Sequence, residues 1–353
     1  MKKGSTHCSW LAVLYHAGPA FLLVLCMAAS AGCLNPLLQH ERVIAPRIVP
    51  VENAAVSPPM VYIFPFEQAA VTLTIPINGS VIAGARAADK EVIIYGNVSE
   101  PDWVAQTYLS MMNDPNQEEF YRNLITRLRE IKEKNALTDD EYAELIVVFV
   151  QSLHYENIRE NAVKFPIETF VDRSGDCDDK SLLLAALLSR EGYRAALFSF
   201  PDESHMAVGI TCTGTDYKKT GYAYIETTNV SFVGVPPGGL IGGIQLRSAP
   251  LVIPVGNGIK TYTSCDQTLY LHDMYTLSEQ KFSELSQKAP AIRAELQALS
   301  DSRNIKAYNQ RVPDYNTMVD TMKQYADIHN YILAHQHDRK GTYEWVKIHS
   351  GNL

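Results

Sequence analysis

The stretch from Leu182 to Leu188 constrains the fold of this chain more than any other feature. It reads Leu-Leu-Leu-Ala-Ala-Leu-Leu, so a helix through it carries apolar side chains on almost every face. Such a helix is normally buried, because none of its faces is suited to water. The sequence therefore predicts that a helix over residues 178–190 lies inside the core of the protein.

Three short strand candidates follow this helix, at Ala195–Phe200, Met206–Ile210 and Tyr222–Glu226. The segments between them are rich in the Pro, Gly and Asp residues that favour turns. Short connections suit antiparallel neighbours, because parallel strands need a long crossover. We therefore predict an α+β fold in which the buried helix packs on an antiparallel sheet, within a core that spans residues 101–245.

The segment before this core, residues 60–100, has the pattern of strands. From Val71 to Ile77, apolar residues alternate with smaller or polar ones, and Asn78-Gly79 follows as a turn dipeptide. Alternation of this kind is typical of a strand with one buried face. We predict a small β-rich segment here.

Helical patterns dominate the rest of the chain. In the core, Thr138 and Glu141 form a capping box that predicts the start of a helix. Residues 246–353 are predicted to be a mostly helical extension, with a break at Pro290 because proline removes a helical hydrogen bond.

The N-terminus has the features of an export signal. Lys2 and Lys3 precede apolar stretches and the small residues 28–32, and Cys33 comes next. Small residues ending in Gly before a Cys resemble the lipobox of prokaryotic lipoproteins, in which that Cys receives a lipid. The alternatives for residues 1–33 are an uncleaved membrane anchor or a secreted form, and all three predict an extracytoplasmic body. Residues 34–59 hold five prolines, which predicts a linker between membrane and body.

The charge of the chain argues against one class of partner. The net charge is −8 at pH 7, and no stripe of Lys and Arg with interleaved aromatic residues is present. Nucleic-acid binding requires a clustered positive surface. We therefore expect no nucleic-acid partner.

Three cysteines lie beyond the export signal: Cys177, Cys212 and Cys265. An odd number in an exported body indicates one free thiol beside one disulfide. If a disulfide forms, Cys212 and Cys265 are the natural pair and Cys177 is free. The alternative is that both remain buried thiols.

Cys177 begins the predicted buried helix, where unpaired N–H groups and the positive end of the dipole favour a thiolate. His205 opens the second strand candidate, from which an imidazole can take the thiol proton. Glu226 ends the third candidate and can fix the imidazole tautomer. The aspartates that flank Cys177 stabilise the helix start but oppose thiolate formation.

Three blocks around these residues resemble the transglutaminase-like superfamily. They are Gly175-Asp176-Cys177-Asp178-Asp179, His205-Met206-Ala207-Val208-Gly209 and Tyr224-Ile225-Glu226-Thr227-Thr228, and they occur in the family's order. Upstream, residues 151–155 and 165–169 are similar to segments of its prokaryotic members. The resemblance covers roughly residues 149–228, under a third of the chain.

The resemblance implies a papain-like core with a Cys-His-Asp triad, in which the cysteine forms a thioester with the acyl group of the substrate. Carried over, Cys177 is the nucleophile, His205 is the general base and then acid, and Glu226 stands where the family has Asp. Gln151 would donate to the oxyanion beside the Cys177 N–H, with Tyr155 as the next candidate. The expected substrate is a polypeptide at the cell surface, whose amide bond is hydrolysed or transferred to an amine. The chemistry requires no metal or organic cofactor.

Two other functions remain open from the sequence. The fold could serve as a non-catalytic peptide-binding or surface-assembly module, of which Glu226 in place of Asp is a first indication. The C-terminal helices could instead dock a partner, with the central domain as scaffold. Alkylation of Cys177 that depends on His205 distinguishes an enzyme from a module.

Overall fold

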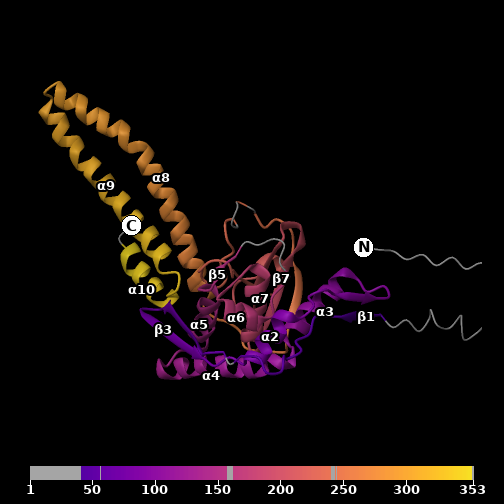
Figure 1. Cartoon of the computed structure of the whole chain (residues 1–353). Helices are drawn as coiled ribbons and strands as arrows, with labels where there is room; N and C mark the ends of the chain where they lie inside the picture. Colours follow the sequence, from indigo (N-terminus) through magenta and orange to yellow (C-terminus); the bar gives the residue numbers. More distant parts are fainter. Residues whose placement is uncertain (1–40, 56, 157–161, 240–242, 244, 352–353) are drawn as a thin grey trace, which may run out of the picture.

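The computed structural model describes residues 41–351, apart from residue 56 and residues 157–161, 240–242 and 244. At its centre lies a four-stranded antiparallel sheet with the order β10-β7-β8-β9 (Figure 1). Its strands are β7 (Ala195–Phe200), β8 (His205–Ile210), β9 (Ala223–Ile225) and β10 (Leu251–Val255). With the helices around the sheet, this is the α+β fold that the sequence predicts.

Helix α7 (Cys177–Arg190) is the predicted buried helix. Every side chain from Leu182 to Leu188 has an exposure of 0%. The helix packs against β7 and β8 and is covered by three other helices. These are α3 (Glu100–Met112), α5 (Asp139–Gln151) and α6 (Pro166–Asp172). The prediction is confirmed, because each face of the apolar run meets another element.

Two small antiparallel strand pairs lie before the core. Strand β2 (Met60–Phe66) pairs with β3 (Ala69–Ile75), and β1 (Arg42–Ile44) pairs with β4 (Ile93–Tyr95). Alternate residues of β2 and β3 are buried, which confirms the strand pattern, and α4 (Glu118–Lys134) packs on β3. The shorter helical turns are η2 (Pro115–Gln117), η3 (Pro201–Glu203) and η4 (Tyr217–Lys219).

Two predictions for the N-terminal region differ from the structure. Asn78 does not turn a hairpin; its side chain accepts a hydrogen bond from the first turn of α2 (Gly79–Ala87) and caps that helix. The described part of the predicted linker 34–59 is held against the body. Ile48 is buried there, and its N–H donates to Asp114 at 2.8 Å.

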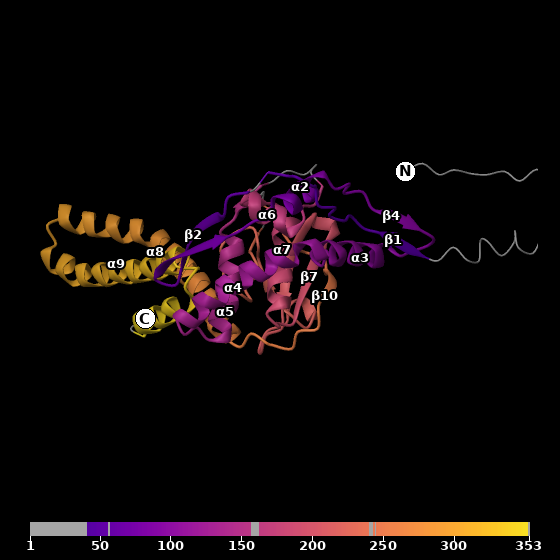
Figure 2. The ribbon, with the colours of Figure 1, turned by 60° about the horizontal axis from the view of Figure 1, so that its bottom comes forward.

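Two long helices form an arm that projects from the body (Figures 1 and 2). They are α8 (Cys265–Asp301) and α9 (Ile305–Ala334), which pack against each other. Helix α8 continues through Pro290, so the predicted break is wrong. Pro290 is exposed, so water can satisfy the carbonyl that the proline leaves without a partner.

The C-terminal region is joined to the sheet, so the predicted core boundary at residue 245 is also wrong. Strand β10 pairs with β7 and completes the sheet from beyond that boundary. A disulfide joins Cys212, just after β8, to Cys265 at the start of α8, with the two Cα atoms 6.4 Å apart. Cys177 is the free cysteine of the described residues.

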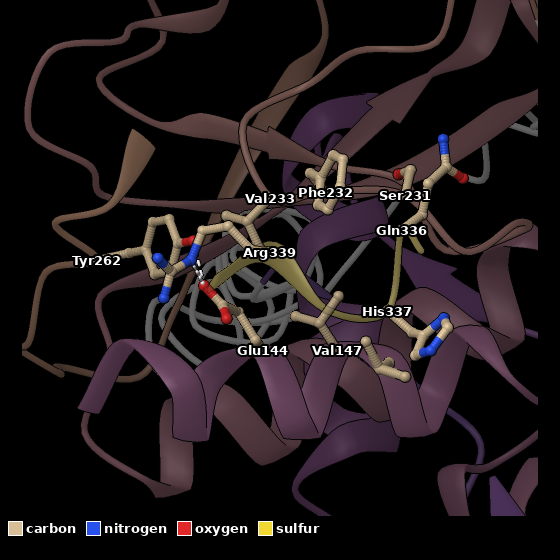
Figure 3. Close-up of a pocket in the computed structure, with 10 residues that line it drawn as sticks. Glu144, Val147, Ser231, Phe232, Val233, Tyr262, Gln336, His337 and Arg339 are labelled. Carbon is tan, nitrogen blue, oxygen red and sulfur yellow. Dashed lines mark hydrogen bonds and ion pairs between the residues drawn. The ribbon is translucent and has the colours of Figure 1, made fainter. Parts of the chain in front are cut away.

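A buried ion pair anchors helix α10 (Arg339–Ser350) to the body (Figure 3). Arg339 Nε lies 2.5 Å from Glu144 Oε1 on α5, and the two side chains are only 7% and 11% exposed. The Tyr262 hydroxyl also donates to Glu144. Because neither charge is well solvated, each depends on the other for its stabilisation.

Among the residues described, no helix has both the length and the apolar character that crossing a bilayer requires. The predicted signal or anchor over residues 1–33, including the lipid attachment at Cys33, lies outside the described residues.

Candidate active site

Cys177 is the first residue of α7, and its neighbours fix that helix start. The Asp176 carboxylate accepts hydrogen bonds from the N–H groups of Asp178 and Asp179, at 3.0 and 3.1 Å. Gly175 is required because a Cβ there would lie 2.6 Å from the Cβ of Asp179. The sulfur therefore lies at the helix end where the dipole favours negative charge.

The thiol of Cys177 is buried, with 8% of the residue exposed. Burial first, and then the Asp178 carboxylate, raise the pKa of the thiol well above its ordinary value. The nearby backbone N–H of Met206 acts in the opposite direction, so the sulfur lies close to the start of β8. The thiol donates to Asp178 Oδ1 at 3.5 Å, and Tyr108 donates to the other oxygen at 3.2 Å. At rest the sulfur is therefore protonated.

His205 opens β8 directly before Met206, and its ring is buried. Its Nε2 lies 3.5 Å from Glu226 Oε2 and 3.2 Å from the hydroxyl oxygen of Tyr224. These two contacts engage Nε2 and fix the orientation of the ring at the start of β8.

The Glu226 carboxylate is fully engaged at the end of β9. Oε1 accepts from the N–H groups of Thr227 and Thr228, both at 2.9 Å, and from the Thr228 hydroxyl at 2.7 Å. Oε2 accepts from the Tyr224 hydroxyl at 2.8 Å. Burial alone would raise the pKa of Glu226, but His205 and Thr228 together lower it to about 2. The carboxylate is thus ionised at neutral pH and reaches His205 despite the longer side chain.

Gln151 is not free to bind an oxyanion, so its predicted role is wrong. Its amide nitrogen donates to the carbonyl oxygens of Glu226 at 2.8 Å and Ser231 at 3.1 Å. These two bonds use both hydrogens of the amide group. The amide oxygen accepts from the Ser231 N–H at 3.4 Å. Gln151 instead holds the backbone that carries Glu226.

Tyr155 remains as the side-chain candidate for an oxyanion donor. It lies in β5 (His154–Tyr155), which pairs in parallel with β6 (Ser174–Gly175), two residues before Cys177. Burial, and then the charge of a Cys177 thiolate, raise the pKa of the Tyr155 hydroxyl to about 12. The hydroxyl therefore keeps its proton at neutral pH and is able to donate it in a hydrogen bond.

Tyr224 is a site residue that sequence reasoning missed. It is fully buried, and its hydroxyl contacts both His205 and Glu226. Alternate residues of a strand share one face. Its position two residues before Glu226 places both side chains on the same face of the strand, and this spacing was the sequence signal for Tyr224.

Asp176, Cys177 and Asp178 are the group that could hold a cation, because their ligand atoms lie within 4.8 Å of one another. Asp176 already accepts two backbone hydrogen bonds, and Asp178 accepts from Cys177 and Tyr108. These contacts satisfy the carboxylates without an ion. The geometry therefore gives no reason to assign a metal here.

No protein-family model, curated protein or solved structure matches this chain. The case for a function therefore rests on the geometry of the site and on the three sequence blocks.

Proposed function

We propose that this protein is a transglutaminase-like cysteine hydrolase or acyltransferase that acts on amide bonds of polypeptides. Cys177 is its nucleophile, His205 its general base and acid, and Glu226 the group that orients His205. One observation carries the proposal. Ionised Glu226 holds the imidazole of His205. The next residue, Met206, has its backbone N–H close to the Cys177 sulfur. A buried helix with the nucleophile at its start, packed on an antiparallel sheet, supports a papain-like core.

The first half of the reaction forms a thioester. The thiol proton passes to the imidazole of His205 while the sulfur attacks the carbonyl carbon of the amide. The N–H of Cys177 and the hydroxyl of Tyr155 donate to the developing oxyanion. The carbon–nitrogen bond then breaks, and the proton on His205 leaves with the amine.

The second half releases the acyl group. His205 takes a proton from water, whose oxygen attacks the thioester carbon, and the carbon–sulfur bond breaks. The proton returns to the sulfur, and a carboxylic acid is released. With an amine in place of water, the same steps form a new amide bond.

The resting protonation state affects how the first step begins. Burial and Asp178 raise the pKa of the Cys177 thiol, so a standing thiolate–imidazolium pair is not favoured. Proton transfer to His205 is therefore coupled to attack on the substrate. We expect alkylation of the free protein to be slow near pH 7 and to accelerate as the pH rises.

The proposal also includes where in the cell the protein acts. The export features through Cys33 favour an extracytoplasmic protein tethered by a lipid or an N-terminal anchor. The substrate would then be polypeptide at the cell surface.

A second candidate function is supported by the same resting state. A protonated thiol that donates to Asp178 suits a peptide-binding module that no longer reacts. The two candidates make opposite predictions about the reactivity of Cys177.

Alkylation of Cys177 in the folded protein tests the proposal. Iodoacetamide labelling is followed by intact mass from pH 5 to pH 9, in wild type, His205→Ala and His349→Ala. His349 is exposed near the C-terminus and is the matched control. We expect labelling to be at least about tenfold slower in His205→Ala, since general-base assistance contributes that much or more. Equal rates in all three proteins would exclude the enzyme and favour the module.

The acyl-enzyme provides the direct test of the substrate class. Wild type and Cys177→Ala are incubated with surface extract, quenched in acid and analysed by peptide mass. A thioester-linked peptide on Cys177, absent from the variant, identifies the acyl donor.

A further inference from the structure

Lys180 is a buried charge one turn along α7 from Cys177, and the proposed reaction does not use it. Its exposure is 0%, and of the lysines and arginines in the described part of the chain only Lys180 and Arg339 are buried. Burial of an ammonium group is unfavourable unless it is paired and hydrogen-bonded. A neutral side chain would suit this position better if it only filled space.

The ammonium group of Lys180 is bound to the end of helix α5. Nζ donates to the carbonyl oxygens of Gln151 at 3.1 Å and Leu153 at 2.8 Å. The last carbonyl groups of a helix have no partner inside it, so Lys180 satisfies groups that would otherwise be unpaired in the core. The opposite charge that acts on Lys180 is Glu226: burial lowers the pKa of the ammonium to about 8, and Glu226 opposes that shift.

A chain of contacts leads from Lys180 to the other site residues. Gln151 accepts from Lys180 through its backbone carbonyl and donates through its side chain to the Glu226 carbonyl. Glu226 in turn holds His205. The strand that begins at His205 lies close to the sulfur of Cys177, three residues before Lys180. The contacts thus form a closed ring through α7, α5 and the two strands.

We propose that Lys180 is a positioning residue for the reaction of Cys177. Its two hydrogen bonds fix the end of α5 against α7, and its positive charge balances the Glu226 carboxylate. The inference rests on the proposed function, because it concerns the same thiol. Methionine has a similar length and apolar stem, but it can neither bind the two carbonyl groups nor balance Glu226.

The test is the pH dependence of Cys177 alkylation in the full-length Lys180→Met variant. We expect labelling at pH 7 to be at least about tenfold slower than in wild type. We also expect its pH midpoint to rise by roughly one unit, because loss of a nearby positive charge disfavours the thiolate. Leu187→Ala is the matched control, since it removes core volume from the same helix. It should lower the melting temperature and leave the midpoint in place.

The outcomes separate a positioning role from a structural one. If Lys180→Met is folded by circular dichroism and keeps both the wild-type rate and midpoint, the proposal is overturned. If Lys180→Met does not fold, the same labelling is measured in Gln151→Leu. This variant keeps Lys180 but removes the side-chain amide that donates to the Glu226 carbonyl, which is the next contact in the ring. A tenfold slower reaction in Gln151→Leu supports the proposal, and an unchanged reaction overturns it. Wild-type labelling that does not depend on His205 would instead overturn the proposed function.

Discussion

The body around α7 and the arm formed by α8 and α9 are both built on helices, but they are stabilised differently. Eleven of the 14 residues of α7 are buried. In α9, only Ile328 and Ile332 of 30 residues are buried. Helix α7 is therefore stabilised by the core on all sides. The arm is stabilised by contact between its two helices and, near the body, by packing with α10 and Phe232. The candidate site therefore lies where positions are fixed most tightly by their surroundings, as precise geometry requires.

The contact that joins α10, the helix after the arm, to the body should show the largest effect. Glu144→Gln is nearly isosteric, but it leaves the buried Arg339 guanidinium, which cannot lose its proton, without its closest counter-charge. We expect the free energy of unfolding to fall by about 3–5 kcal/mol, measured with denaturant. Lys340→Met removes a neighbouring pair in which the lysine is 56% exposed and Glu141 only 6%. Glu141 still accepts a hydrogen bond from the Thr138 N–H, so the effect should stay within about 1 kcal/mol. Similar losses in both variants would mean that burial does not distinguish the two pairs.

A cavity in α7 tests the body itself. Leu184 has an exposure of 0%, so Leu184→Ala leaves an internal space that the surrounding elements cannot fill completely. We expect the free energy of unfolding to fall by about 2–5 kcal/mol in the same denaturant assay. A loss below 1 kcal/mol would show that the core around α7 is loosely packed.

The disulfide between Cys212 and Cys265 should contribute less. It joins residues 53 positions apart, and its removal is expected to lower stability by about 2–4 kcal/mol. Thermal unfolding with and without reductant measures this loss. The Cys212→Ser/Cys265→Ser variant is the control and should melt at one temperature in both conditions. If reductant leaves the wild-type melting temperature unchanged, the covalent link does not stabilise the junction.

The site in the body also makes stability depend on pH. The pKa of Glu226 is lowered from 4.5 to about 2, so the native carboxylate binds protons more weakly than the unfolded one. Its contribution is present above pH 4.5 and is lost as the pH falls toward 2. Between pH 6 and pH 2.5, wild type should lose about 2–3 kcal/mol more than Glu226→Gln in denaturant unfolding. Equal losses of unfolding free energy in wild type and Glu226→Gln would show that the folded protein does not lower the pKa of Glu226.

The smallest effect is expected in the arm. Leu333 is 52% exposed near the end of α9, and Leu333→Ala is the matched counterpart of Leu184→Ala. Its effect on the free energy of unfolding should stay within about 0.5 kcal/mol, because exposed positions away from special contacts are tolerant. A loss comparable to that of Leu184→Ala would mean that the arm is packed against another molecule in solution.

The elements that could be predicted from the sequence are those with strong local patterns. The apolar run of α7 specifies a buried helix, and the capping box of Thr138 and Glu141 marks the start of α5 as predicted. The Cys212–Cys265 pairing was one of two open alternatives, and the structure contains it. For α7 and α5, a short stretch of residues is enough to specify the local structure. For the disulfide, the small number of cysteines limits the possible pairings.

The features that could not be predicted depend on residues far apart in the chain. Gln151 loses its oxyanion role to Ser231, which is 80 positions away. Asn78 caps a helix because the chain after it packs on the core, whereas a turn dipeptide alone favours a hairpin. The helix through Pro290 persists because that residue faces solvent. No local sequence pattern indicates which distant residues a side chain will contact or whether a given position will face solvent.

The anchoring of α10 sets an order for maturation of the protein. Arg339 follows Glu144 by 195 positions, so a chain that emerges N-terminus first exposes the acid long before its counterion exists. Until the last helix docks, Glu144 lacks its counter-ion. Burial raises the pKa of Glu144 to about 7 even with Arg339 in place, so without Arg339 the acid would be protonated. Full stability of the body is therefore expected only once α10 has docked and paired Arg339 with Glu144.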